Sequence, residues 1–312
     1  MLGYHYLPFS AHPSKCAADR AMIFRITHTT DYRYAEPVAE AYLELRLKPP
    51  NREVQTVQEH RLTIEPVSRT SGYQDYFGNE VAFLSLPFRH TRLTIRSEAV
   101  VNTIPCALPE QSLDLTIQES RQILAGALPF VFDYLQPTEM VKIGRESVQW
   151  ARRYLNGRTT LREGLESLNN AIHENFQYRK GATNFSTDVS STWRDRIGVC
   201  QDFAHIMLSV LRPAGLPSRY VCGYIETAPP RGENGEKKRL IGSVATHAWV
   251  EVLVPGQHWI ALDPTNNRWC GEQHISVSFG RDASEAAPIR GTFKGTGEQS
   301  LKVQVKVVRL KK

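Results

Sequence analysis

The chain has 312 residues, 41% hydrophobic and 22% charged, which is ordinary for a globular protein of about two domains. Its net charge is +6, but residues 281–312 alone hold eight basic and three acidic residues, so no basic nucleic-acid surface is indicated. No apolar run approaches the roughly 18 residues of a membrane helix, and the N-terminus lacks a signal pattern. We therefore expect a cytoplasmic protein that binds neither nucleic acid nor a membrane.

Cysteine usage argues against a disulfide framework and against a zinc site. The five cysteines are odd in number and form no C-x-x-C pair. A zinc site built from Cys200, His205 and His247 would lack the usual spacing of ligand pairs. We expect no metal and no cofactor.

The first part of the chain predicts a β-sandwich. Residues 1–21 show no hydrophobic period and are expected to be a disordered leader. Residues 22–105 hold at least five strand-like runs separated by proline, glycine and asparagine, which is typical of an antiparallel sandwich. These runs are 23–34, 41–48, 60–65, 80–86 and 91–103.

Helices follow, as the start of a catalytic core that we place at residues 106–275. One helix is predicted from about residue 138 to a stop at Asn156-Gly157. The next opens at Thr160 with Glu163 three residues later, a capping-box pattern. Its apolar face comprises Leu161, Leu165, Leu168, Ile172 and Phe176.

Cys200 opens a further predicted helix. Counting from it, apolar residues fall at offsets 3, 4, 7, 8 and 11, the stripe of a helix packed on a core. A buried, unreactive thiol is the ordinary interpretation of a cysteine. A helix start, however, presents free N–H groups and a positive dipole, both of which stabilise a thiolate.

A β-hairpin follows. Residues 246–254 alternate like a strand, Pro255-Gly256-Gln257 is a turn signal, and residues 258–263 form the second strand. A three-residue loop places Asp263 on the same face as His247, one cross-strand diagonal away. A two-residue loop would place it on the opposite face. A polar loop at 228–239 precedes the hairpin, and residues 276–312 form an extension ending in an edge strand.

These residues carry a resemblance. Residues 198–205 (Gly-Val-Cys-Gln-Asp-Phe-Ala-His), 246–252 (Thr-His-Ala-Trp-Val-Glu-Val) and 262–266 (Leu-Asp-Pro-Thr-Asn) resemble the core of the bacterial transglutaminase-like proteins, a papain-like branch often labelled cysteine proteases. Residues 24–30 and 75–79 resemble the family's N-terminal region. The resemblance implies an α+β fold, with an antiparallel β-sandwich followed by a nucleophile helix packed on an antiparallel sheet.

The resemblance also implies acyl transfer through a Cys-His-Asp triad. Cys200 would attack an amide carbonyl, His247 would shuttle the proton, and Asp263 would orient the imidazole. The oxyanion would rest on the Cys200 N–H and one further donor. The candidates for that donor are Tyr178, Gln201 and Trp193.

Other residues near these motifs have a structural alternative. Asp202 either tunes the nucleophile or caps the helix start. Trp249 either packs or lines the cleft. His205 lies ~140° around the helix from Cys200, so a structural hydrogen bond is expected. His258 is expected at the surface.

The fate of the acyl-enzyme stays open at this point. Attack by water gives a peptidase or amidase, which the bacterial resemblance favours, together with the polar 228–239 loop, which predicts an open, wet cleft. Attack by a lysine amine gives a Gln–Lys cross-linking transglutaminase. A non-enzymatic binding module on the same fold is the third alternative. The expected substrate is a peptide or protein amide, and the family implies association with ATP-grasp peptide ligases.

Overall fold

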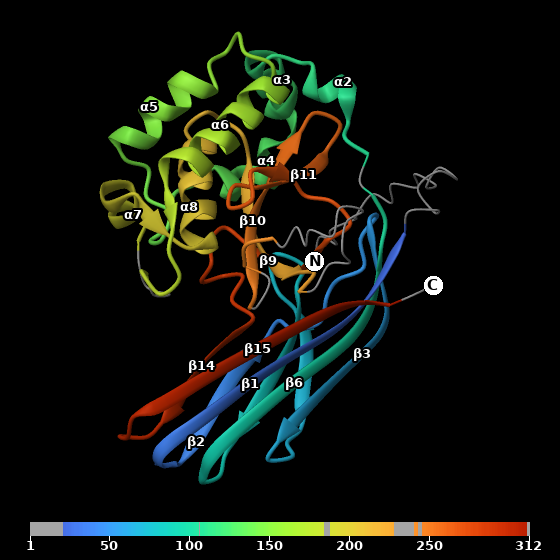
Figure 1. Cartoon of the computed structure of the whole chain (residues 1–312), viewed down its shortest axis with the longest axis vertical. Helices are drawn as coiled ribbons and strands as arrows, with labels where there is room; N and C mark the ends of the chain where they lie inside the picture. Colours follow the sequence, from blue (N-terminus) through green and yellow to red (C-terminus); the bar gives the residue numbers. More distant parts are fainter. Residues whose placement is uncertain (1–20, 106, 184–187, 228–239, 243–244, 311–312) are drawn as a thin grey trace, which may run out of the picture.

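The computed structural model describes residues 21–105, 107–183, 188–227, 240–242 and 245–310. The fold is α+β and has two parts, an elongated pair of β-sheets and a core of helices around a third sheet (Figure 1). The expected leader at 1–21, apart from Ala21, and the polar loop at 228–239 lie outside the described residues. None of the described helices combines the length and the apolar character needed to cross a bilayer.

The N-terminal region supplies six of the eight strands of a sandwich made of two four-stranded sheets. The strands are β1 (Met22–Val38), β2 (Glu40–Leu45), β3 (Gln55–Glu65), β4 (Thr70–Gln74), β5 (Glu80–Leu86) and β6 (His90–Thr103). Leucine and isoleucine side chains from β2, β3, β5 and β6 meet between the sheets in one buried cluster. The strand β4 was not predicted, because all five of its residues are exposed and show no hydrophobic alternation.

Two C-terminal strands return to complete this sandwich. They are β14 (Ile289–Lys294) and β15 (Gln299–Leu310), and the sheet orders are β15-β1-β6-β3 and β14-β2-β5-β4. β15 lies antiparallel to β1, with Ile23 opposite Leu310. The predicted edge strand at the C-terminus is thus confirmed, and its partner is the first strand of the chain.

A layer of helices precedes the nucleophile segment. Its members are α2 (Glu110–Leu113), α3 (Ile117–Leu124), η1 (Ala125–Ala127), α4 (Leu128–Val131), η2 (Phe132–Leu135), α5 (Arg145–Tyr154), α6 (Leu161–Asn175) and α7 (Val189–Asp195). The predicted capping box of Thr160 and Glu163 is confirmed at the start of α6. The predicted start of α5 near 138 is wrong. Thr138 forms a local turn with Val141, and the helix begins only after Gly144 in extended backbone.

The core sheet has the order β12-β11-β10-β9-β13. Its strands are β9 (Ser218–Ile225), β10 (His247–Val254), β11 (His258–Asp263), β12 (Arg268–Trp269) and β13 (His274–Gly280). The helix α8 (Cys200–Leu211) packs on the Ala248, Val250, Val252 and Val254 face of β10. β7 (Gln177–Tyr178) and β8 (Ile197–Gly198) form a short parallel pair.

The boundary expected at residue 275 needs correction. It cuts β13, which pairs with β9 through Gly280 and therefore belongs to the core sheet. A second buried cluster joins the two parts of the molecule, with Phe24 and Val101 from the sandwich against Tyr224 and Ile275 from the core. The core sheet is therefore held directly against the sandwich.

Candidate active site

Cys200 occupies the first position of α8, as its sequence neighbourhood predicts. The first helical hydrogen bond runs from the Phe203 N–H to the Val199 carbonyl, so the helix does not use the Cys200 N–H. The thiol is free and half-buried, against a helix that is otherwise almost wholly buried. This placement points the positive end of a twelve-residue helix at the sulfur.

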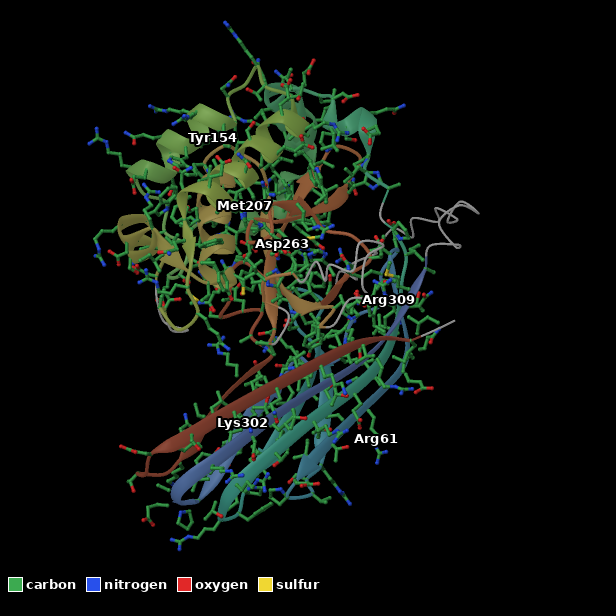
Figure 2. All side chains as sticks on the ribbon, in the orientation of Figure 1. Arg61, Tyr154, Met207, Asp263, Lys302 and Arg309 are labelled. Carbon is green, nitrogen blue, oxygen red and sulfur yellow. The ribbon has the colours of Figure 1, made fainter. Side chains whose placement is uncertain are left out.

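The hairpin register brings Asp263 to His247. Val254 pairs with His258 and Val250 with Leu262, which confirms the three-residue loop. The His247 Nε2 atom lies 2.8 Å from Asp263 Oδ2, and both side chains are fully buried. Figure 2 shows Asp263 in the part of the core that faces the sandwich. The carboxylate thus holds the far nitrogen of the imidazole.

The electrostatics of the pair favour an ionised site. Burial alone would lower the pKa of His247, but the charge and hydrogen bond of Asp263, helped by a contact with Cys200, raise it to about 10. Burial would raise the pKa of Asp263, but His247 and His274 outweigh it and hold that pKa well below its usual range. Both shifts favour an imidazolium next to a carboxylate at neutral pH.

The other ring nitrogen of His247 is left for the thiol. Nδ1 is buried, and its contact with Cys200 does not reach ordinary hydrogen-bond geometry. Nucleophile and base commonly tighten only when substrate binds. The arrangement can form a thiolate–imidazolium pair, in which Asp263 fixes the ring from the opposite side.

Several groups besides His247 form hydrogen bonds to the carboxylate of Asp263. The N–H groups of Thr265 and Asn266 donate to Oδ1 at 3.0 and 3.1 Å. The Asn266 side-chain amide donates to Oδ2 at 2.7 Å, and His274 Nε2 lies 3.2 Å from the same oxygen. Neither Asn266 nor His274 was predicted as a site residue, although Asn266 belongs to the Leu-Asp-Pro-Thr-Asn motif.

Asn266 also fastens a short segment over the imidazole. Its Oδ1 accepts the Ile241 N–H at 2.8 Å, and its amide donates to the Ile241 carbonyl at 3.2 Å. The next residue, Gly242, has a φ of +96°, and a Cβ there would overlap His247 Nδ1. Only a glycine therefore fits against this nitrogen.

Asp202 caps the helix start. Its Oδ2 accepts the Val199 N–H at 2.7 Å and the Thr183 hydroxyl at 2.6 Å. Burial raises the pKa of Asp202. The sequence leaves two roles open for Asp202, and these hydrogen bonds are the ones expected of a helix cap.

The three candidates for the second oxyanion donor have different surroundings in the structure. Tyr178 pairs with Gly198, two residues before Cys200, and burial, followed by the charge of Cys200, raises the pKa of Tyr178. Gln201 is half-buried in the first turn of α8 beside the nucleophile. The Trp193 prediction is wrong, because its indole N–H donates to Ser209 Oγ inside a cluster with Trp150.

The remaining residues of the motifs have structural positions. His205 is buried and accepts the Ala283 N–H at 3.1 Å, the expected structural hydrogen bond. Trp249 is buried with its ring 6.1 Å from that of His247, so it packs under the site. His258 is exposed, as predicted. In the described part of the chain, no group of three or more His, Cys, Asp or Glu side chains could hold a metal ion.

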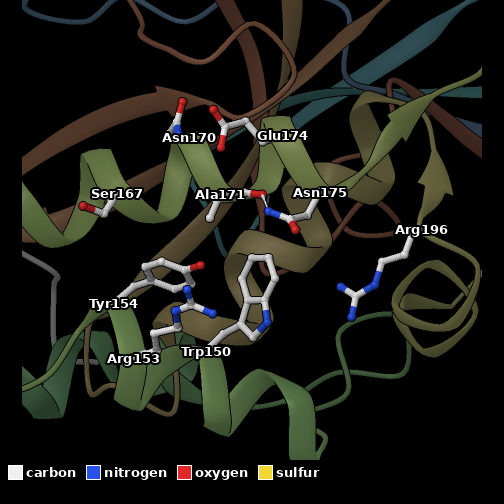
Figure 3. A pocket seen from close by; sticks show the side chains of 9 residues that line it. All are labelled: Trp150, Arg153, Tyr154, Ser167, Asn170, Ala171, Glu174, Asn175 and Arg196. Atoms are coloured by element: carbon white, nitrogen blue, oxygen red, sulfur yellow. Dashed lines mark hydrogen bonds between the residues drawn. The ribbon is translucent and has the colours of Figure 1, made fainter.

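A hollow lies away from these residues, between α5 and α6. Its volume is about 600 Å³, and Figure 3 shows Arg153, Tyr154 and Trp150 facing α6 across it. Cys200, His247 and Asp263 are not among its lining residues. Its lining offers polar surface but no nucleophile paired with a base.

Comparison with known proteins agrees with these observations. The model of the bacterial transglutaminase-like N-terminal region matches residues 24–102, and that of the transglutaminase-like superfamily matches residues 148–264. An uncharacterized protein of Mycobacterium tuberculosis is 36% identical over 297 residues, which cover 91% of this chain and 92% of that protein. The chain belongs to the bacterial transglutaminase-like family.

More distant similarities fit this family. A protein-glutamine gamma-glutamyltransferase of Pseudomonas aeruginosa is 35% identical over 100 residues, 30% of this chain and 14% of that protein. The crystal structure of a candidate cysteine protease from Cytophaga hutchinsonii superposes with a TM-score of 0.73 at 20% identity, covering 94% of this chain and 92% of that one. This last likeness shows a shared fold, and the family membership supports thiol-dependent activity in broad terms.

Proposed function

We propose that this protein is a thiol enzyme that cleaves amide bonds through Cys200, His247 and Asp263. One observation carries the proposal: the buried His247 ring is held by Asp263 on Nε2 and left open on Nδ1 toward the thiol of Cys200. This arrangement supports the proposal, because acyl transfer by a thiol needs a nucleophile, a base and a carboxylate that orients the base.

The steps follow from this geometry. The Cys200 thiolate attacks the amide carbonyl carbon, and the oxygen takes up the charge near the helix start, facing the Cys200 N–H. The imidazolium of His247 then protonates the leaving amine, and a thioester remains on Cys200. Water attacks the thioester and gives its proton to His247, so the acid leaves and the thiolate–imidazolium pair is restored. Asp263 keeps its charge throughout.

Tyr178 and Gln201 are the proposed candidates for a second oxyanion donor. Tyr178 lies within the field of the Cys200 thiol and has no hydrogen bond in the described contacts that would commit its hydroxyl elsewhere. Gln201 follows the nucleophile directly. A phenol or amide donor near the carbonyl oxygen would each add to the backbone N–H.

Transfer to an amine is the second candidate function. The similarity to a protein-glutamine gamma-glutamyltransferase favours it, since the same thioester would then be opened by a lysine amine. We prefer water as the acceptor on the basis of the family resemblance. The loop at 228–239, on which the expectation of an open cleft depends, lies outside the described residues. Cytoplasmic location and association with an ATP-grasp ligase stay predictions.

The deciding experiment offers a peptide pool to the enzyme with and without a millimolar primary amine. Masses of the products distinguish a gain of water from a gain of the amine. We expect cleavage products that disappear in Cys200→Ala. Predominant amine incorporation that also disappears in Cys200→Ala would reverse the choice of acceptor and keep the three residues in place. Binding of peptides with no turnover in any form would favour the binding module.

A further inference from the structure

A second histidine, His274, contacts the carboxylate of Asp263. It is the first residue of β13 and is 8% exposed. Its Nε2 lies 3.2 Å from Asp263 Oδ2, the same oxygen that contacts His247 Nε2 at 2.8 Å. Asp263 therefore stands between two imidazoles, only one of which faces the nucleophile.

The hydrogen bonds of His274 define its protonation. The Gly271 N–H donates to His274 Nδ1 at 3.3 Å, which requires an unprotonated nitrogen there. The proton of the neutral ring must then be on Nε2, which donates to Asp263. Burial, acting against the carboxylate, lowers the pKa of His274, in agreement with a neutral ring.

The ring is held from the side of the sandwich. The His274 N–H donates to the Gly271 carbonyl at 2.9 Å, which closes the turn, and Thr103 at the end of β6 donates to the Glu272 carbonyl at 2.8 Å. The Trp249 ring meets His274 edge-on at 5.4 Å. A small cavity of about 60 Å³ lies behind these residues, where the sandwich meets the core sheet.

We propose that His274 is a positioning residue for the proposed amide-cleaving site. As a neutral Nε2–H donor it helps to keep Asp263 ionised and fixes the carboxylate in the rotamer that holds His247. At metal sites, loss of a hydrogen bond that orients a ligand commonly costs 10- to 100-fold in metal affinity or activity, and we expect a loss of similar size here. The inference rests on the proposed function, because it assigns His274 a role only through Asp263 and His247.

Two substitutions separate the hydrogen bonds of His274. In His274→Asn the amide oxygen takes the place of Nδ1 and can accept the Gly271 N–H, but nothing reaches Asp263. In His274→Gln the longer side chain carries its N–H group to the place of Nε2. We expect His274→Asn to slow the alkylation of Cys200 by iodoacetamide at pH 6 about tenfold or more, and kcat to fall similarly with KM unchanged. His274→Gln should restore most of the rate.

The matched control is His28→Asn in the sandwich. His28 is also buried and bonded, to Tyr224 at 2.7 Å and to Thr30 at 3.1 Å, but it does not touch Asp263. It should lower stability without slowing alkylation. Thermal unfolding of each variant, followed by circular dichroism, separates a change in rate from a loss of fold.

Failure of the inference and failure of the proposed function give different results. If Cys200 in the wild-type protein reacts no faster than in His247→Ala, the ion pair and the proposed function both fail. If the wild-type thiol is activated and His274→Asn matches it, only the role of His274 is overturned. Should both His274 variants unfold, nitrogen NMR of the wild-type histidines decides. A neutral ring protonated on Nε2 supports the proposal, and an Nδ1-protonated or charged ring overturns it.

Discussion

Three described cysteines have different surroundings, and this difference predicts their reactivity. Burial, followed by the charge of Cys200, raises the pKa of Cys222 to about 12, whereas Cys200 faces a charged imidazole at a helix start. We expect iodoacetamide at about pH 6 to label Cys200 before Cys222 and Cys270, as judged by peptide masses. His247→Ala should abolish this preference. Labelling that merely follows exposure would contradict the ion pair.

Gly242 gives a second prediction at this scale. A methyl group on its Cα would overlap the His247 nitrogen that faces the nucleophile, and the left-handed backbone adds strain. Gly242→Ala should displace the ring and lower kcat about 100-fold, with KM little changed. The control is Gly126→Ala, because a Cβ there meets nothing within 4 Å. Equal kinetics of the two variants would show that the ring tolerates the displacement.

The sequence revealed some site residues and concealed others for a physical reason. Cys200, His247 and Asp263 each stand at the start or end of an element with clear periodicity, so their faces could be worked out locally. His274 and Gly242 reach the site only through turns that bring separate segments together. Local sequence patterns do not encode contacts between separate segments.

At the scale of elements, the hairpin decides whether the site exists. Its three-residue loop was predicted from Pro255-Gly256-Gln257 and is confirmed by the register. Gly256 and Gln257 have φ values of +85° and +62°, so the turn uses two left-handed residues. The starts of α6 and α8 and the alternation of β10 were likewise predicted from neighbouring residues in the sequence. Two features could not be located by periodicity: β4 is exposed throughout and lacks hydrophobic alternation, and the turn between Thr138 and Val141 delays the start of α5.

Deleting Gly256 is therefore expected to remove the site while keeping a hairpin. A one-residue slip of register turns every side chain of β11 to the other face, which moves Asp263 away from His247. Activity and rapid labelling of Cys200 should both disappear. The control is Gly256→Ala, which strains the turn by about 1 kcal/mol but keeps the register. If the deletion variant stays active, the loop has shortened without changing the pairing of β10 with β11, and the prediction is wrong.

At the scale of the whole molecule, two buried amides join the sandwich to the free edge of the core sheet. Gln55 exchanges two hydrogen bonds with the backbone of Ser276, at 2.9 and 3.0 Å. Asn79 does the same with Phe279, at 2.8 Å for both. The two side-chain amides thus form with β13 the hydrogen bonds that the backbone of a neighbouring strand would form. The strands of each part follow from periodicity, but no pattern in the sequence indicates that side chains cover this edge.

Asn79→Leu should accordingly destabilise the protein as a whole. It leaves the N–H and carbonyl of Phe279 buried without partners, at a cost of about 1–3 kcal/mol for each group. Urea unfolding should show a lower midpoint in one cooperative transition. The control is Gln74→Leu, a polar residue of comparable size that is exposed at the end of β4. A midpoint unchanged in Asn79→Leu would show that the interface does not depend on these bonds.

Buried histidines in both parts of the molecule predict its response to acid. Burial lowers the pKa of His28 in the sandwich and of His205 in the core to about 4. The unfolded chain, with an ordinary pKa near 6.5, binds more protons between these values, so stability is complete above pH 6.5 and is lost as pH falls toward 4. Each histidine contributes roughly 3 kcal/mol over that interval. His247 affects stability in the opposite direction. Its pKa in the folded protein is raised to about 10, so its protonation stabilises the fold fully below about pH 6.5, and this stabilisation is lost as pH rises through 10.

The free energy of unfolding, from urea titrations at a series of pH values, should therefore decline steeply between pH 6.5 and 4. In His28→Asn one of the two groups no longer titrates, so the curve should lose less over the same interval, by up to roughly 3 kcal/mol. The variant will start from a lower stability at pH 7, because its bond to Tyr224 is altered. The slope with pH, not the absolute value, is the test. Parallel curves for the two proteins would show that His28 is accessible to protons in the folded state.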